Sequence, residues 1–276
     1  MKNIVTRSIS GVIYVILISF SILCDQYTYA SLFAIVTGLC LWEFYSLLEK
    51  NGEIQINKPI ATLGGVYLFV TGFLWFAGLA PVKYLSLWFI IMLYLNISEL
   101  YKKEEHIIRN IAYTFLGQIY IALPFMFLSR LGFSMNEIMQ PSYNQIFLMS
   151  FFLLIWASDT GAYLTGSYFG KHKLFERISP KKTWEGTIGG ALLAVIVAIV
   201  ISQLFPGQLT FWKWIGFSLI TIIFGTWGDL FESMIKRSLK VKDSGNMIPG
   251  HGGILDRFDS SILAAPAVVI YYLFVS

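Results

Sequence analysis

Long runs of apolar residues recur along the whole chain, and short polar segments separate them. The approximate cores of nine such runs are residues 8–24, 28–48, 60–79, 82–98, 110–129, 146–168, 187–205, 210–231 and 258–275. A helix needs roughly 20 mostly apolar residues to cross a bilayer. The pattern therefore predicts an all-α, polytopic integral membrane protein with about nine transmembrane helices.

The composition agrees with this pattern. Of the 276 residues, 56% are hydrophobic and only 13% are charged, whereas a soluble domain carries about 25% charged residues. No polar stretch is long enough to form a separate soluble domain. We therefore expect a single transmembrane domain over residues 1–276. Within it, residues 1–140 hold spans without a recognisable motif, and residues 141–276 hold the catalytic spans and their cytoplasmic loops.

Basic residues alternate between the two sides of this predicted topology. If the N-terminus is cytoplasmic, 17 of the 20 Lys and Arg residues lie on the cytoplasmic side, and only Lys83, Arg130 and Lys213 lie opposite. Cytoplasmic loops carry such an excess, so we expect a cytoplasmic N-terminus. The two most basic loops, before the seventh and ninth runs, then share the cytoplasmic side. Such loops attract anionic head groups and phosphate-bearing solutes.

Six acidic residues lie in or beside the apolar runs, where a charge is costly and indicates a functional site by default. They are Glu43, Asp159, Asp229, Glu232, Asp256 and Asp259. Glu43 lies near the cytoplasmic end of the second run, so snorkelling to the surface is an alternative to a function there. Asp159 lies deep enough in the sixth run to need a further explanation.

The last four acids form two pairs, each with a spacing of three that places both members on one helix face. Because the eighth run leads into the connection from which the ninth starts, we expect both pairs at one depth near the cytoplasmic surface. Converging carboxylates need a cation, and Mg²⁺ binds carboxylate oxygens and substrate phosphates together. The structural alternative is that Asp256 is a helix N-cap paired with Arg257, and that Asp259 is a first-turn acid.

The connection between these pairs reads KVKDSGNMIPGHGGILDRFDS and spans residues 240–260. Its proline and glycines exclude a regular helix, and such a loop can bring backbone N–H groups close to phosphate oxygens. His251 can donate to a phosphate or act as an acid, and a purely hydrogen-bonding role is the alternative. Lys236, Arg237 and Lys242 add cations. The set suits phosphoryl or nucleotidyl transfer, in which catalysis consists mostly of positioning and charge neutralisation.

A resemblance joins these features. The segment SMIKRSLKVKDSGNMIPGHGGILDRFDS, residues 233–260, resembles the signature of the phosphatidate cytidylyltransferases, also called CDP-diacylglycerol synthases. The upstream segments DTGAYLTGSYFGKHKL, ISPKKTWEG and GDLFES are similar to that family as well, so the resemblance covers roughly residues 155–265. It implies a nucleotidyltransferase of phospholipid biosynthesis that converts CTP and phosphatidic acid into CDP-diacylglycerol and pyrophosphate with Mg²⁺.

The resemblance also implies roles for individual residues. The metal ligands would be Asp229, Asp256 and Asp259, with Lys236 and His251 as further catalytic residues. Lys236, Arg237, His251 and the amides of Gly252 and Gly253 would hold the CTP phosphates. Ser179, Lys181 and Lys182 would bind CTP or the lipid head group. The remaining substrate-binding candidates are Asp159, Ser233, Lys242 and Arg257.

The expected partners are CTP, phosphatidic acid and membrane lipid, with no nucleic acid, and the resemblance suggests a homodimer. Whether a second metal ion joins the first stays open. We expect a bacterial inner membrane location with the active site facing the cytoplasm. The alternatives are a CTP-dependent polyprenol kinase, which would attack the γ-phosphorus, a secondary transporter with intramembrane acids as ion sites, and a membrane scaffold, which would have no use for converging carboxylates.

Overall fold

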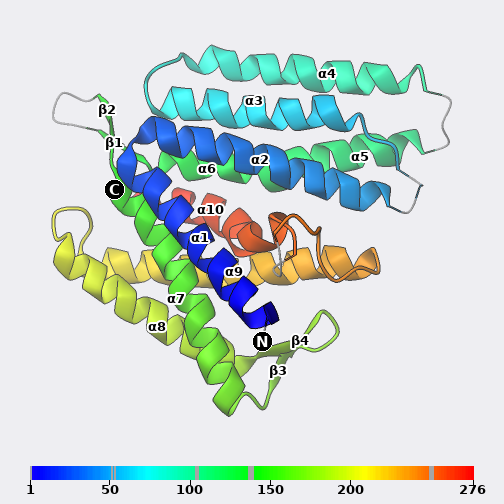
Figure 1. Ribbon diagram of the computed structural model, residues 1–276. Coiled ribbons are helices and arrows are strands. Elements are labelled where there is room, and N and C mark those ends of the chain that lie inside the picture. Colours follow the sequence, from blue (N-terminus) through cyan, green and yellow to red (C-terminus); the bar gives the residue numbers. More distant parts are fainter. Residues whose placement is uncertain (1, 51, 53, 103–105, 136–139, 249–251) are drawn as a thin grey trace. The chain divides into compact units, whose positions relative to one another are not determined.

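The computed structural model describes residues 2–50, 52, 54–102, 106–135, 140–248 and 252–276, with side chains from residue 9 onward. It divides the chain into two compact units (Figure 1). Unit 1 comprises residues 1–145 and 243–257, and unit 2 comprises residues 146–242 and 258–276. The glycine-rich segment near the C-terminus therefore packs within the N-terminal unit.

Unit 1 is built from helices in a stack. Its elements are α1 (Lys2–Cys24), α2 (Gln26–Glu49), α3 (Lys58–Phe76), η1 (Val82–Ser86), α4 (Leu87–Glu99), α5 (Ile107–Gly117), η2 (Gln118–Ala122), α6 (Leu123–Arg130), β1 (Phe133–Met135) and β2 (Pro141–Tyr143). Helix α3 packs against α2, α4 and α6, and Figure 1 shows these helices running alongside one another. The Asp25 carboxylate starts α2 by accepting the N–H groups of Tyr27 and Thr28.

Aromatic side chains fill the interior of unit 1. Tyr29, Phe33, Phe69 and Phe125 are fully buried, and the ring centroids of Tyr29 and Phe33 lie 4.6 Å apart. Aromatic side chains bury a large apolar area each, so they contribute most to the packing of such a core.

One polar side chain, Gln118, is buried in this apolar interior. It lies on η2, a π-helical turn between α5 and α6. Its Nε2 donates to the Tyr45 hydroxyl at 2.9 Å and to the Ala61 carbonyl at 2.7 Å, and its Oε1 accepts from Trp88 Nε1 at 3.2 Å. These bonds tie four helices together, because the four residues come from η2, α2, α3 and α4.

Unit 2 contains the remaining long helices and a small hairpin. Its elements are α7 (Gln145–Phe169, from its second residue), β3 (Lys173–Phe175), β4 (Ser179–Thr183), α8 (Trp184–Leu204), α9 (Phe211–Ser238) and most of α10 (Leu255–Val275). Strands β3 and β4 are antiparallel, with Phe175 opposite Ser179. The buried Phe147 ring contacts the buried rings of Trp214, at a centroid distance of 5.4 Å, and Tyr272, at 4.6 Å.

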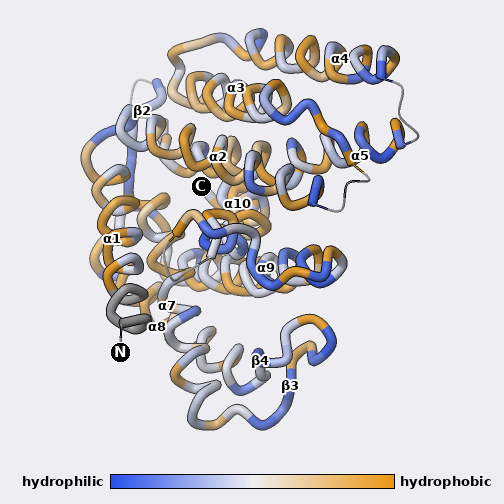
Figure 2. The backbone as a smooth tube through the Cα atoms, turned by 45° about the vertical axis from the view of Figure 1, so that its right-hand side comes forward, coloured by the Kyte–Doolittle hydropathy of each residue, from blue (hydrophilic) through white to orange (hydrophobic). Residues whose placement is uncertain are grey.

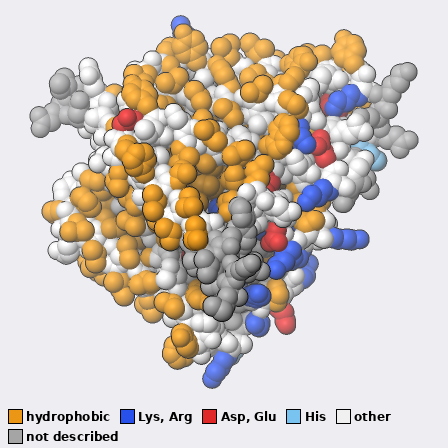
Figure 3. Space-filling model, in the orientation of Figure 1, with side chains coloured by type: hydrophobic (Ala, Val, Ile, Leu, Met, Phe, Trp, Pro, Cys, Tyr) orange, Lys and Arg blue, Asp and Glu red, His pale blue; other side chains and the backbone are white. Residues whose placement is uncertain are grey.

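The surface of α8 shows why these helices belong in a membrane. Ile188, Leu192, Ile196 and Val200 repeat every four residues and are all more than half exposed, while the opposite face buries small residues. An apolar face without protein cover suits lipid. Figure 2 shows the same hydrophobic character along most helices, and Figure 3 shows exposed hydrophobic side chains spread over the visible face.

The predicted all-α membrane fold is confirmed. Among the described residues, eight helices are long and apolar enough to cross a membrane, and Ile9–Cys24 of α1 is a shorter apolar helix. Each of the nine predicted runs therefore corresponds to a helix or, at 82–98 and 110–129, to consecutive helical segments. The number of spans, the cytoplasmic N-terminus and the single domain stay predictions.

Three local features differ from the hydropathy pattern. The run predicted at 82–98 begins as the 3-10 turn η1, and the β1–β2 and β3–β4 hairpins were not predicted. Helix α9 continues to Ser238, seven residues beyond the predicted end at 231. Lys236 and Arg237 thus lie on the last turn of a helix, where cations are favoured by the helix dipole.

We predict that Gln118→Leu lowers the stability of the protein in detergent by about 1–3 kcal/mol, because the Trp88 indole and the Ala61 carbonyl lose a buried partner. The measurement is thermal unfolding of the purified protein. Gln203→Leu, at an exposed position of α8, is the matched control and should melt with the wild type. A Gln118→Leu protein that is as stable as the wild type would contradict this interpretation.

Candidate functional site

Helices α7 and α8 approach each other closely through glycine. A Cβ atom on Gly161 would lie 2.8 Å from the Gly189 carbonyl oxygen, and one on Gly190 would lie 2.5 Å from the Ser158 carbonyl oxygen. Real Cβ atoms do not tolerate such distances, so larger residues would separate the helices. The close contact brings the polar segment 158–160 of α7 next to the start of α8. Small residues allow such close approach at membrane helix interfaces.

A pocket of about 460 Å³ opens beside this contact, within unit 2. Residues of α7, β4, α8 and α9, with Ser260 of α10, line it. Part of its wall is apolar and includes Ile155, Ala162 and Ile222. The charged lining residues are Asp159, Lys181, Lys182 and Asp229. The pocket can therefore hold a ligand that has both an anionic and an apolar part.

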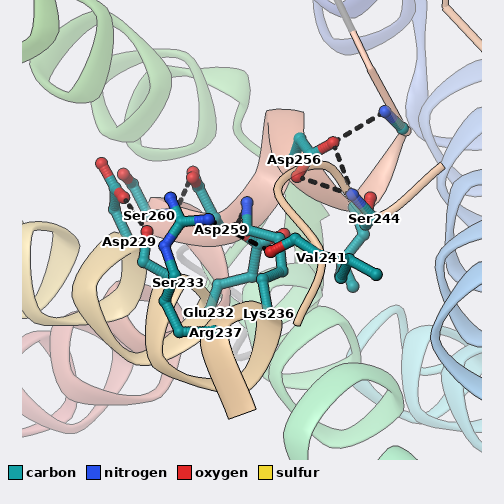
Figure 4. Close-up of polar contacts among 12 residues, drawn as sticks. Asp229, Glu232, Ser233, Lys236, Arg237, Val241, Ser244, Asp256, Asp259 and Ser260 are labelled. Atoms are coloured by element: carbon teal, nitrogen blue, oxygen red, sulfur yellow. Dashed lines mark hydrogen bonds and ion pairs between the residues drawn. The ribbon is translucent and has the colours of Figure 1, made fainter. Parts of the chain in front are cut away.

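Lys182 and Asp229 form an ion pair in this pocket. The Lys182 Nζ lies 2.5 Å from Asp229 Oδ2, and the Ser233 hydroxyl donates to the other carboxylate oxygen at 3.3 Å. Figure 4 shows Asp229 and Ser233 one turn apart on α9. Both charged side chains remain about a quarter exposed, so a ligand can reach them.

Two further acids act on this pair. Asp259 interacts electrostatically with Asp229, Asp159 and Lys182, and its Oδ1 accepts the Ser260 N–H at 2.6 Å. Gly228 permits this arrangement, because a Cβ atom there would lie 2.5 Å from the Asp259 carbonyl oxygen. The predicted acids Asp229 and Asp259 are thus brought together with Asp159, which was predicted only as a substrate-binding residue.

The chemistry of these donors fits Mg²⁺, which prefers carboxylate oxygens. Three acids share the neighbourhood of Lys182, and like charges held together favour binding of a cation. In the described part of the chain, however, no group of three or more His, Cys, Asp and Glu lies close enough together to hold a metal ion. The assignment of Asp229, Asp256 and Asp259 as ligands stays a prediction.

Asp256 lies in unit 1, where backbone amides surround its carboxylate. It accepts the N–H of Ser244 at 3.0 Å and the N–H of Gly253 at 2.7 Å (Figure 4). Gly252 has a φ of +84°, a conformation that favours glycine, and its carbonyl accepts the Ile248 N–H at 2.9 Å. The Gly253 amide, predicted to bind phosphate, is therefore directed to Asp256 in this structure.

The predicted cations of α9 also have protein partners. Lys236 is buried and forms an ion pair with Glu232 one turn earlier. Arg237 donates to the carbonyl oxygens of Ile178 at 3.4 Å and Val241 at 3.1 Å. Arg237 thus ties the end of α9 to the β3–β4 hairpin and to the following turn.

The remaining predicted residues are dispersed. Lys242 is exposed, Ser179 begins β4, and the Arg257 carbonyl accepts the Tyr14 hydroxyl at 3.1 Å. His251 lies outside the described residues.

The sequence interpretation missed several polar residues of the pocket. Ser158, Thr187 and Thr226 line it. A helix-face plot of α9 would have placed Thr226 with Asp229, three positions later, whereas Ser158 and Thr187 had no such signal. The sequence interpretation also missed the part played by Glu185, whose carboxylate accepts the N–H groups of Lys171 and His172 and closes the hairpin. These hydrogen bonds join residues that the hydropathy pattern assigns to a loop without regular structure.

Comparisons with known proteins agree with these features. The cytidylyltransferase family matches residues 5–275 of the chain. Proteins named phosphatidate cytidylyltransferase are similar to it: one from Staphylococcus aureus is 38% identical over 182 residues, or 66% of this chain and 65% of the relative. One from Haemophilus influenzae is 44% identical over 138 residues, 48% of each chain. One from Staphylococcus haemolyticus is 48% identical over 124 residues, 45% of this chain and 48% of the relative.

We predict that Gly228→Ala lowers the stability by about 1–3 kcal/mol, because the added methyl group meets the α10 backbone at a fixed carbonyl. The same substitution at Gly225 is the control, since its Cβ would make only ordinary contacts, at 3.7 Å or more, with Ser260. Thermal unfolding of both variants in detergent measures the difference. Equal melting temperatures would show that α9 and α10 are not in the contact described.

Proposed function

The chain belongs to the cytidylyltransferase family, and we propose that it transfers the cytidylyl group of CTP to phosphatidate, producing CDP-diacylglycerol and pyrophosphate. The observation that carries the proposal is the unit 2 pocket, which combines acids and lysines with an apolar wall. One substrate, CTP, is a nucleoside triphosphate, and the other, phosphatidate, is a lipid phosphate. Both need charge neutralisation, and the lipid also needs access from a membrane.

The reaction requires one bond to form and one to break. A phosphate oxygen of phosphatidate attacks the α-phosphorus of CTP, and the bond from that phosphorus to the oxygen of the β-phosphate breaks. Pyrophosphate leaves with the electron pair. The attacking oxygen is already anionic, so no strong general base is needed, and positioning with charge neutralisation supplies most of the catalysis.

Lys181 and Lys182 are the pocket's cations, and we assign them to the phosphates of the two substrates. Lys182 can pass from Asp229 to a phosphate oxygen, because an ammonium group is a point charge on a flexible stem. A Mg²⁺ ion held by Asp229 and Asp259 would neutralise the triphosphate and the departing pyrophosphate. Asp159 would add to the negative field that favours that ion.

The bilayer constrains where the site can lie. Phosphatidate is anchored by acyl chains, and CTP is soluble, so the pocket must open both to lipid and to water. We propose that it faces the cytoplasm from the inner membrane of a bacterium, in agreement with the basic loops and the bacterial relatives. A homodimer stays a prediction.

The fate of a radioactive label tests the proposed reaction. Purified protein in mixed micelles receives phosphatidate, Mg²⁺ and CTP labelled at either the α- or the γ-phosphorus. We expect the α-label in a chloroform-soluble lipid and the γ-label in pyrophosphate, with EDTA abolishing both. A lipid that carries the γ-label would identify a kinase, and the absence of labelled lipid with folded protein would refute the transfer.

In the same assay, Asp259→Asn should reduce transfer by roughly 100-fold or more, because it removes a charge that stabilises the transition state through the bound cation. Size-exclusion chromatography should show a folded protein, since the substitution keeps the size of the side chain. Glu176→Gln is the control, because Glu176 is an exposed acid in the turn between β3 and β4. Normal turnover by Asp259→Asn would contradict the assignment.

A further inference from the structure

A buried acid of α2 contacts the glycine-rich connection, defined as residues 243–248 and 252–254. Glu43 is only 4% exposed, although hydropathy alone allows it to snorkel to the surface. Its Oε2 accepts the N–H of Leu255 at 2.9 Å across 212 residues of sequence. All the groups in this contact belong to unit 1.

The Glu43 carboxylate occupies the space that two glycines leave open. A Cβ atom on Gly245 would collide with Glu43 Oε1, and a Cβ on Gly253 would collide with the same atom and with the Ser244 hydroxyl. These glycines are therefore required at their positions by the carboxylate that packs against them. The contact fixes the connection from the side of α2.

The other side of the connection is held by Asp256, through its bonds from the Ser244 and Gly253 N–H groups. The Glu43 and Asp256 carboxylates interact electrostatically. Backbone N–H groups donate to both: Leu255 to Glu43, and Ser244 and Gly253 to Asp256. Glu43 also binds the first N–H of α10, a position where a negative charge is favoured. The start of α10 is thereby fixed, and Asp256 and Asp259 lie within its first two turns.

We propose that Glu43 is a positioning residue for cytidylyl transfer, because it fixes the connection and the start of α10 that carry the acids of the site. The inference rests on the proposed function. Its direct contacts are with the connection and with the Leu255 N–H, so Glu43 acts on the reaction through the first turns of α10, which carry Asp259. The N-terminal spans thus contribute to the reaction although they contain no motif.

Steady-state kinetics of Glu43→Gln test this role, with Glu49→Gln as the matched control. Glu49 is another α2 acid, and it accepts the Ile56 N–H at 3.1 Å in a different loop. At a temperature where both variants are folded, we expect Glu43→Gln to lower kcat roughly ten- to hundredfold, because small displacements of reacting groups have effects of that size. The KM for CTP should change much less, and Glu49→Gln should keep the wild-type kcat.

Hydrogen exchange separates positioning from general support of the fold. In Glu43→Gln, amides of the connection and of Leu255 should exchange faster, while those of α3 and α6 should keep wild-type rates. A wild-type kcat in Glu43→Gln would overturn the proposal. So would unfolding of the whole unit, because Glu43 would then be a general structural residue. If the wild-type protein transfers no label, the proposed function fails, and the exchange data still report the contact.

A double substitution tests the contact itself. Gly245→Ala should reduce kcat in the wild type, because its methyl group meets the Glu43 carboxylate. In a Glu43→Ala background that obstacle is absent, and the added alanine should have little further effect. Additive losses from the two substitutions would contradict the packing of Glu43 against Gly245. If Glu43→Ala does not fold, Glu43→Ser serves as the background, and the same non-additivity is expected because its short side chain also leaves that space open.

Discussion

Lys182 and Asp229 form an ion pair in the unit 2 pocket, and two further acids, Asp159 and Asp259, lie close to this pair. Acids among apolar helices raise the free energy of the folded state unless cations or amides compensate them. Lys182 supplies one positive charge to this group of acids. In the proposed function, a cation bound by Asp229 and Asp259 would supply more, and it would neutralise the phosphates of a nucleotide.

The two units compensate buried acids differently. Unit 2 uses a lysine, which can exchange partners when a ligand arrives. Unit 1 uses backbone amides: Glu43 and Asp256 accept N–H groups of Leu255, Ser244 and Gly253. Amides fixed in a backbone cannot follow a ligand, so this arrangement suits positioning. The glycines of the connection follow from it, since any side chain would fill the space of a carboxylate.

The sequence was sufficient for the membrane fold and for the family, because apolar length and a long signature are local properties. The hydropathy pattern ended the eighth span near residue 231, whereas α9 extends to Ser238, because hydropathy falls where the charged residues begin although the helix continues. The sequence placed Asp229 and Asp259 at one depth, because the eighth apolar run leads into the connection from which the ninth starts. It could not place Asp159 beside them or Glu43 against the connection, because those contacts join residues about 70 to 212 positions apart.

The central claim is that the unit 2 pocket binds the triphosphate between Lys182 and the acids. The most direct measurement is an experimental structure of the full chain with Mn²⁺ and a non-hydrolysable CTP analogue, with the metal located by its anomalous scattering. We predict a metal peak in contact with Asp229 and Asp259, and Lys182 bound to a phosphate oxygen in place of Asp229. A nucleotide bound elsewhere, with the Lys182–Asp229 pair intact, would contradict the account.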